Sequence, residues 1–381
     1  MQKKKWPLSD ERELEKLKEV LSNNGWWRGS GNMVDEFEKN FSSFHNTKYA
    51  LAVSNGTQAL EIALRALGIE KECEVIVPAF TFIATATAVM NVGATPVFCD
   101  VNKDTFCMDA DDFERKITSK TKAVIPVHMG GQLCDMEKIS KIAKRNNIQI
   151  IEDAAHAHGG EWCNNKVGYY SDIATFSFQN RKVMTCGEGG ALITNNPTLY
   201  KTSYLLHSVG RPPGDLKYEH LILGTNARMN EFQAAILLCQ LERLTTFTKI
   251  REKNANILDN LLADVKGITP QKQNKKCTFN THYMYMFYYD STYFGNMKRE
   301  TFISKLNAEG IECHFPYPLV FDAKFYKTTP YIQYKEADFP NSSKIAKEVV
   351  WIPHYELLED VKYLRTIHDK IISLQNTCEG H

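Results

Sequence analysis

Short β-rich apolar runs alternate with helical patterns between about residue 50 and residue 195. In the helical segments the apolar residues recur at spacings of three and four, which is typical of amphipathic helices. This alternation predicts an α/β fold, in which a mostly parallel sheet is covered by helices on both faces. The expected strands are 51–53, 75–77, 96–98, 123–125, 148–151, 173–178 and 191–193, and the expected helices are 57–66, 81–90 and 135–146.

The rest of the chain predicts a second, smaller α+β unit. A first helix is expected to begin after Ser9 or Asp10, to place Leu14, Leu17, Val20 and Leu21 on one face and to end at Gly25. A chain of 381 residues is too long for one small core, so we predict two domains. The predicted large domain is 25–250 and the small domain combines 1–24 with 251–381; the helices expected outside the alternating region are 228–265, 297–309, 341–349 and 358–374, with a strand near 282–289.

The composition argues against several classes of protein. A formal net charge of +1 gives no basic excess for binding nucleic acid. No apolar run approaches the roughly 18 residues of a membrane span, and the first ten residues lack the apolar core of a secretory signal. The ten cysteines contain no C-x-x-C pair, so we expect reduced thiols, no metal site and a cytoplasmic protein.

Lys182 is the strongest candidate for covalent chemistry. It lies on a predicted loop between the apolar run 173–178 and the sequence Gly187-Glu188-Gly189-Gly190. A lysine amine attacks an aldehyde only when it is neutral, so a reactive lysine needs a desolvated or cationic setting. The apolar run and the neighbouring Arg181 offer such a setting, whereas the alternative is an ordinary solvated lysine.

Two further features complete a predicted site for pyridoxal phosphate. Asp153 ends an apolar run, where its carboxylate can keep a pyridine nitrogen protonated, although it can also serve as a helix N-cap. Gly56 and Thr57 open a predicted helix whose N–H groups favour phosphate, although Asn-Gly is above all a turn signal. Ligands of parallel sheets bind at the carboxyl ends of the strands, where these residues are expected to meet.

Three other side chains are candidates for the same cofactor. The hydroxyl of Ser177 can bind the phosphate, and Phe82 can stack on the pyridine face. His156 lies three residues after the predicted acid and can hydrogen-bond the ring hydroxyl. The alternatives are core packing for Phe82 and a structural role for His156.

With these residues in view, the chain resembles the DegT/DnrJ/EryC1/StrS aminotransferases, a family of fold-type I enzymes that use pyridoxal phosphate. The resemblance covers nearly the whole chain and rests on motifs in one particular order. These are Ala52-Val53-Ser54-Asn55-Gly56-Thr57-Gln58-Ala59-Leu60, Val75-Ile76-Val77-Pro78-Ala79-Phe80-Thr81-Phe82, Pro126-Val127-His128, Ile151-Glu152-Asp153-Ala154-Ala155, Phe176-Ser177-Phe178 with Lys182, Gly187-Glu188-Gly189-Gly190, and Asn226-Ala227-Arg228-Met229.

The resemblance implies a role for each matching residue. Lys182 stands where the family carries the lysine that binds the cofactor covalently, and Asp153 stands on the acid for the pyridine nitrogen. Asn226 stands on an asparagine that reaches the phosphate of a neighbouring subunit, which implies a homodimer with shared active sites. Position 156 is histidine here where many members have glutamine. The other implied cofactor residues are Gly56, Thr57, Phe82 and Ser177.

The resemblance implies transfer of an amino group from glutamate or glutamine to a cyclic ketone, most simply a keto-sugar or a nucleotide-linked keto-sugar. Within the family, Trp26-Trp27-Arg28 and the segment 176–180 are similar to 3-amino-5-hydroxybenzoate synthases, and the inosose aminotransferases share parts of the pattern. A sensor that binds a ligand without catalysis is the alternative of another class. The candidate substrate contacts are Trp27, Arg28, His314, Tyr317 and His354.

Overall fold

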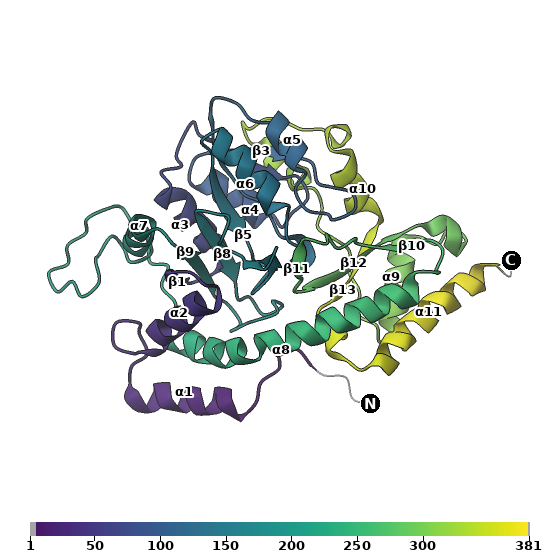
Figure 1. Ribbon diagram of the computed structural model, residues 1–381, viewed down its shortest axis with the longest axis horizontal. Helices are drawn as coiled ribbons and strands as arrows, with labels where there is room; N and C mark the ends of the chain where they lie inside the picture. The colour runs from purple at the N-terminus through teal and green to yellow at the C-terminus, as the bar shows by residue number, and fades with distance from the viewer. Residues whose placement is uncertain (1–4, 380–381) are drawn as a thin grey trace.

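A seven-stranded sheet forms the centre of the larger part of the molecule in the computed structural model, which describes residues 5–379 (Figure 1). The strand order is β1-β9-β8-β5-β4-β2-β3. Only β9 runs antiparallel to its neighbours, so the mostly parallel sheet predicted from the sequence is confirmed. The strands are β1 (Tyr49–Val53), β2 (Glu74–Pro78), β3 (Thr95–Cys99), β4 (Thr121–Val124), β5 (Gln149–Asp153), β8 (Ile173–Ser177) and β9 (Gly190–Thr194).

Alternating side chains of these strands feed two apolar clusters, one on each face of the sheet. In β2, Ile76 belongs to the first cluster, while Val75 and Val77 belong to the second. The helices that pack on the first face are α2 (Met33–Phe44), α5 (Ala110–Arg115), α6 (Met136–Arg145) and α8 (Glu231–Leu262), and those on the second are α3 (Gly56–Ala66), α4 (Ala84–Asn91) and α7 (Pro197–His207).

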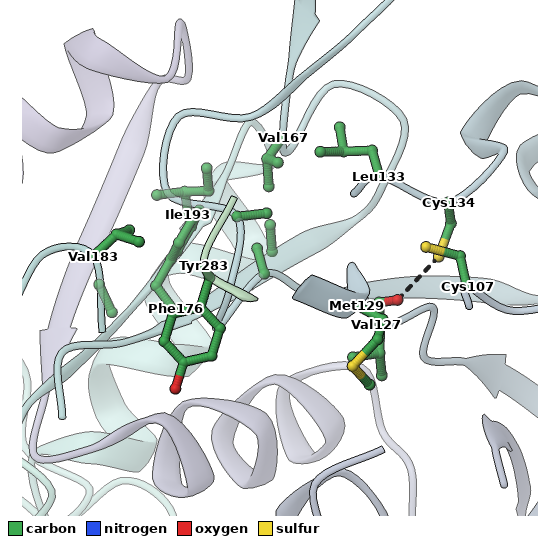
Figure 2. Packing of buried hydrophobic residues seen from close by; sticks show 14 of the residues in the cluster. Cys107, Val127, Met129, Leu133, Cys134, Val167, Phe176, Val183, Ile193 and Tyr283 are labelled. Carbon is green, nitrogen blue, oxygen red and sulfur yellow. Dashed lines mark hydrogen bonds between the residues drawn. The ribbon is translucent and has the colours of Figure 1, made fainter. Parts of the chain in front are cut away.

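Figure 2 shows part of the first cluster. Phe176 of β8 and Ile193 of β9 lie in it, together with Val183 from the loop that carries Lys182. The thiol of Cys134 donates a hydrogen bond to the carbonyl of Val127 at 3.2 Å, which is the dashed line in the figure. The loop that carries Lys182 is therefore anchored by the packing of Val183 in the first apolar cluster.

A three-stranded antiparallel sheet organises the smaller part of the molecule. Its order is β10-β12-β13, and it packs with the second half of α8 around a third apolar cluster. Figure 1 shows α8 running from beneath the large sheet towards this small one. The elements are β10 (Ile268–Pro270), β12 (Met284–Tyr289), β13 (Val349–Pro353), α9 (Arg299–Ala308), α10 (Pro340–Glu348) and α11 (Val361–Glu379), and a separate sheet joins β11 (Cys277–Phe279), β6 (Glu161–Trp162) and β7 (Asn165–Lys166).

The predicted domain boundary near residue 250 falls inside α8, and the division into two domains stays a prediction. Between residues 5 and 379, no helix is long and apolar enough to cross a membrane. Residues 1–4, at the start of the predicted N-terminal segment, lie outside the described residues, as do residues 380 and 381.

The N-terminal helix differs in detail from the prediction. Helix α1 (Glu11–Asn23) begins after Asp10 in a capping box, but it ends on Asn24 in a left-handed conformation and not on Gly25. Of its predicted apolar face only Val20 is fully buried, whereas Leu14 and Leu21 are exposed. A polar contact also holds the helix, because buried Glu13 pairs with Arg243 of α8. The apolar spacing therefore predicted a larger buried face than α1 has in the structure.

Helices α2, α5 and α7 were not expected from the sequence. In α2 the buried residues Met33, Val34, Phe37 and Phe41 do follow helical spacing, so the signal was present in the pattern. Helix α4 begins at Ala84, three residues later than predicted at 81. The residues before it form a loop after β2, and this loop carries Phe82.

A buried ion pair ties α2 to the edge of the large sheet. The guanidinium of Arg28 makes two hydrogen bonds to the carboxylate of Glu38, at 2.6 and 2.7 Å. Glu38 also accepts a hydrogen bond from the backbone N–H of Ala52 in β1. Burial raises the pKa of Glu38, and Arg28 opposes that shift. Both groups are buried, so neither can lose its partner without leaving an isolated charge or polar group.

We predict that Glu38→Leu lowers the free energy of unfolding by about 3–5 kcal/mol, because it leaves Arg28 buried without a partner. The double variant Arg28→Met, Glu38→Leu should recover most of that loss. Asp35→Asn, which changes an exposed carboxylate 3.6 Å from the same guanidinium, should change stability by about 0.5 kcal/mol or less. Denaturant titration followed by circular dichroism measures all three. Equal losses in the single and double variants would contradict the charge-pairing explanation.

Candidate active site

A cavity of about 730 Å³ opens at the carboxyl ends of the parallel strands. The segments that follow β1, β2, β5 and β8 each contribute to its wall, as expected for an open α/β sheet. The structure brings together on this wall a set of the residues proposed from the sequence, namely Gly56, Thr57, Phe82, Asp153, His156, Ser177, Lys182 and Tyr317.

Lys182 is buried, with 9% of its surface exposed. Its Nζ lies 4.6 Å from the centre of the Tyr283 ring. Burial lowers the pKa of Lys182 to about 8, and the negative charge of Asp153 opposes that shift. A substantial fraction of this amine is therefore neutral near physiological pH, as a nucleophilic lysine requires.

The loop that carries Lys182 is fixed from several directions. The backbone N–H of Lys182 donates to the carbonyl of Gln179 at 2.8 Å. The next two anchors come from distant parts of the chain, since Trp6 Nε1 donates to the carbonyl of Asn180 at 2.9 Å and His354 Nε2 lies 3.0 Å from the carbonyl oxygen of Arg181. The position of the amine is thus set by both ends of the sequence.

Asp153 ends β5 and is buried. Its carboxylate accepts hydrogen bonds from Thr85 Oγ1 at 2.8 Å and from the backbone N–H of Ala155 at 3.2 Å. The second bond is the capping contact considered as an alternative, so the residue caps a turn and also faces the cavity. Burial raises the pKa of Asp153, while Lys182 and His128 oppose the shift. A cationic group bound opposite this acid would keep it ionised.

The N-terminus of α3 forms the second side of the cavity. Its N-cap Asn55 accepts a hydrogen bond from the N–H of Gln58, and its first turn contains no acidic residue. The first N–H groups of a helix have no partner within the helix, so this end favours an anion. Glycine is required at position 56, because a Cβ there would lie 2.8 Å from Cβ of Ser177.

Glycine is also required at position 190, where β9 begins. A Cβ on Gly190 would lie 2.4 Å from the carbonyl carbon of Asn55. The missing side chain lets β9 and the start of α3 approach closely. The Gly-rich sequence after Lys182 therefore helps to shape the anion-binding side of the cavity.

His156 and Phe82 lie on the wall between these two sides. The ring of His156 stacks on that of Tyr283, with centroids 4.3 Å apart, and its Nε2 lies 3.4 Å from the hydroxyl of Tyr317. Burial lowers the pKa of His156 well below its usual value, so the ring is neutral. Its Nδ1 is buried and has no partner among the described residues. Phe82 is 51% exposed, and its ring centre lies 5.5 Å from that of Tyr317.

The structure does not bring the remaining predicted residues into this wall. Trp27 is 55% exposed, and His314 contacts Glu312 and the ring of Trp351. Asn226 is exposed in an antiparallel bridge to Ser208.

Arg28 and His354, proposed as substrate contacts, make polar contacts elsewhere in the chain. The guanidinium of Arg28 is occupied by Glu38, and His354 is buried behind the Lys182 loop. Neither lines this cavity, and their roles as substrate contacts stay predictions.

Sequence reasoning also missed parts of the wall. Tyr283 and Trp351 come from the smaller part of the molecule, and Gln179 and Glu188 flank the Lys182 loop. Thr85, which holds Asp153, lies on α4 near the strand that precedes it. The only signal for Gln179 and Glu188 was their closeness to Lys182, whereas nothing local marks Tyr283 or Trp351.

These features fit pyridoxal phosphate. A buried amine of lowered pKa and a buried acid both line the cavity. The N-terminus of α3, whose first turn has no acidic residue, lies on the same wall. The unpartnered Nδ1 of His156 offers a polar contact between them. Among residues 5–379, no group of three or more His, Cys, Asp or Glu side chains is placed to hold a metal ion. The fold and the cavity together define a pyridoxal phosphate-dependent aminotransferase of fold type I.

The chain belongs to the DegT/DnrJ/EryC1/StrS aminotransferase family, whose model matches residues 7–370. It is 38% identical over 364 residues to 3-amino-5-hydroxybenzoate synthase of Amycolatopsis mediterranei, covering 93% of this chain and 92% of that protein. It is 40% identical over 274 residues to GDP-perosamine synthase of Escherichia coli O157:H7, covering 72% and 74% of the two chains. It is 38% identical over 295 residues to L-glutamine:2-deoxy-scyllo-inosose aminotransferase of Streptomyces kanamyceticus, covering 74% and 69%.

Solved structures agree with this assignment. The crystal structure of 3-amino-5-hydroxybenzoic acid synthase superimposes with a TM-score of 0.93 at 35% identity, covering 98% of both chains. A putative sugar aminotransferase from Streptococcus pneumoniae, in its pyridoxal phosphate form, gives a TM-score of 0.88 at 26% identity and also covers 98% of both chains. Pyridoxal phosphate is accordingly the cofactor of this chain.

We predict that cofactor-free protein reacts with pyridoxal phosphate at a rate that rises about tenfold per pH unit below the pKa of Lys182, because only the neutral amine is nucleophilic. The rate should level off above pH 8, in line with a pKa of about 8. Stopped-flow absorbance of the cofactor measures it.

Asp153→Asn removes the negative charge that raises the pKa of Lys182, so the midpoint should move to lower pH. Glu188→Gln, on the same wall but without a recognised effect on that pKa, is the matched control. A midpoint that stays near pH 10 in the wild-type protein would show that the amine is not desolvated.

Proposed function

We propose that this enzyme transfers an amino group from glutamate or glutamine to a ring ketone of the keto-sugar or cyclitol type. The observation that carries the proposal is the pairing of buried Lys182 with buried Asp153 in one cavity. The three relatives are a 3-amino-5-hydroxybenzoate synthase, an inosose aminotransferase and a GDP-perosamine synthase, and they support a ring compound as the acceptor. A glutamine donor is named for the inosose aminotransferase, which supports this donor.

Lys182 does the proton chemistry in this proposal. When bound, pyridoxal phosphate supplies an electron sink for the carbon that carries the donor's amino group. Lys182 Nζ removes the proton from that carbon and, with the acceptor in place, delivers a proton to the former carbonyl carbon. A pKa of about 8 suits both directions, because the base and its conjugate acid are both populated near neutral pH.

The other wall residues bind and orient. Asp153, held by Thr85 and Ala155, would hold the pyridine nitrogen in its protonated form. The N-terminus of α3, with Gly56, Thr57 and Ser177, would bind the phosphate. His156 would contact the ring hydroxyl, and Phe82 would cover one ring face. Each role is matched by a side chain or backbone group that faces the cavity.

A shikimate-type ring that bears a carboxylate is the second candidate acceptor. Two observations favour it, namely the 93% coverage of this chain in the match to 3-amino-5-hydroxybenzoate synthase and the TM-score of 0.93 with the crystal structure of such a synthase. Arg181, a cation on the cavity wall, is compatible with a carboxylate. A nucleotide-linked keto-sugar remains the first choice among sugars, as the match to GDP-perosamine synthase supports.

An acceptor screen tests the proposal. Protein loaded with pyridoxamine phosphate is mixed with a nucleotide-linked keto-sugar, an inosose and a shikimate-type ketone, and return of the aldehyde absorbance is followed. We expect return with at least one ring ketone, and Lys182→Ala should abolish it because the proton has no carrier. A protein that binds the cofactor but changes absorbance with neither glutamate, glutamine nor any ketone would be a sensor and would refute the proposal.

We also propose that the enzyme is a homodimer in which Asn226 completes the partner's phosphate site. Asn226 is exposed and does not line the cavity of its own chain. The segment before it, 210–225, projects beside α7 (Figure 1) and exposes large apolar side chains, including Leu216 at 91% and Leu223 at 84%. Exposed apolar side chains that gather on one segment are typical of an interface.

Subunit exchange tests the shared site. Lys182→Ala and Asn226→Asp should each be nearly inactive alone, the second because it places a carboxylate against phosphate. After equal mixing, about a quarter of the wild-type activity should return, since half of the dimers are mixed and each of these has one intact site. If Asn226 served its own chain, no activity would return on mixing.

A further inference from the structure

Arg181 is an exposed cation on the cavity wall next to the reacting lysine. Its backbone is held at both ends of the residue, because its N–H donates to Gln179 Oε1 at 2.9 Å and its carbonyl oxygen lies 3.0 Å from His354 Nε2. The side chain therefore starts from a fixed point. Among residues 5–379, the arginines that form ion pairs are Arg12, Arg28, Arg115, Arg145, Arg211 and Arg243, and Arg181 is not one of them.

The positive charge of Arg181 acts on three tyrosine side chains. Burial raises the pKa of Tyr283 to about 12, and Arg181 is the first group that opposes this shift. Arg181 also opposes the raised pKa values of Tyr317 and Tyr355. Tyr283 and Tyr317 line the cavity, and Tyr283 lies under Lys182 Nζ. The guanidinium therefore acts on the aromatic side of the cavity wall, and Arg181 itself lines that wall.

The other charged side chains of the wall are less suited to binding an anion, because they are negatively charged or are needed for the proton chemistry. Asp153 is held by Thr85 and Ala155. Glu61 accepts hydrogen bonds from Gln58 and Asn91, both at 2.7 Å. Lys182 is reserved for the chemistry. Arg181 is the remaining cation on this wall among the described residues.

We propose that the guanidinium of Arg181 binds a carboxylate of the substrate, through two parallel hydrogen bonds, beside the atom that reacts with Lys182. An arginine fork matches a carboxylate in geometry as well as in charge. The inference rests on the proposed aminotransferase function and adds a specificity-determining residue to it. The carboxylate belongs either to the amino donor or to a ring acceptor, and the two sources are separable by experiment.

Calorimetric titration of the cofactor-loaded enzyme tests this with two unreactive probes. Glutarate has the shape of the donor without its amine, and 3-hydroxybenzoate is a ring carboxylate without a ketone. Arg181→Gln should weaken binding of at least one probe by about 10- to 100-fold, and Arg181→Lys should fall in between because it keeps the charge but loses the fork. Arg365→Gln, an exposed arginine on α11 outside the cavity wall, is the matched control.

The outcomes separate the sources. Weakening for glutarate assigns the carboxylate to the donor, and weakening for 3-hydroxybenzoate assigns it to the acceptor. Unchanged affinity of Arg181→Gln for both probes, or no saturable binding of either to the wild-type protein, overturns the proposal. Retained cofactor absorbance in each variant verifies that the site is folded. Because these titrations need no turnover, failure of the Arg181 assignment and failure of the acceptor screen are distinguishable.

Discussion

The burial of one amine and one carboxylate in the wall of the same cavity is the constraint on which the rest of this structure depends. Desolvation lowers the pKa of Lys182 to about 8 and raises that of Asp153, and the two charges partly offset each other's shift. Removing water is therefore what makes the lysine reactive. The cost of this desolvation is partly offset by the hydrogen bonds from Thr85 and Ala155 to Asp153 and by the Tyr283 ring next to Lys182 Nζ.

Parallel strands explain why the main part of the site could be predicted from the sequence. Gly56, Asp153 and Ser177 each stand at or just past the end of a β-rich run, and such ends meet at one edge of the sheet. Tyr283 could not be placed in this way, because it lies just before β12, far along the chain, and reaches the main apolar cluster and the cavity only through long-range packing. The contact between Arg28 and Glu38 could not be predicted, because Glu38 lies in α2, a helix that was not expected although its apolar spacing was visible.

The Lys182 loop is held by contacts from both ends of the chain. Trp6 and His354, from opposite ends of the chain, hold the carbonyl groups of Asn180 and Arg181. These contacts fix the backbone from which the side chains of Arg181 and Lys182 extend. A preorganised arrangement of this kind favours catalysis because little has to be reordered when substrate binds. Substrate preference can then change at position 181 without disturbing the sheet.

Borohydride reduction of the pyridoxal phosphate-loaded enzyme, followed by peptide mass mapping, is the most direct measurement of the central claim. The reduction makes a lysine–cofactor bond permanent, so the modified residue reports which amine is neutral and buried beside the acid. The structure predicts a single modified peptide in which the cofactor mass lies on Lys182. Modification spread over exposed lysines, or its absence from position 182, would contradict the account.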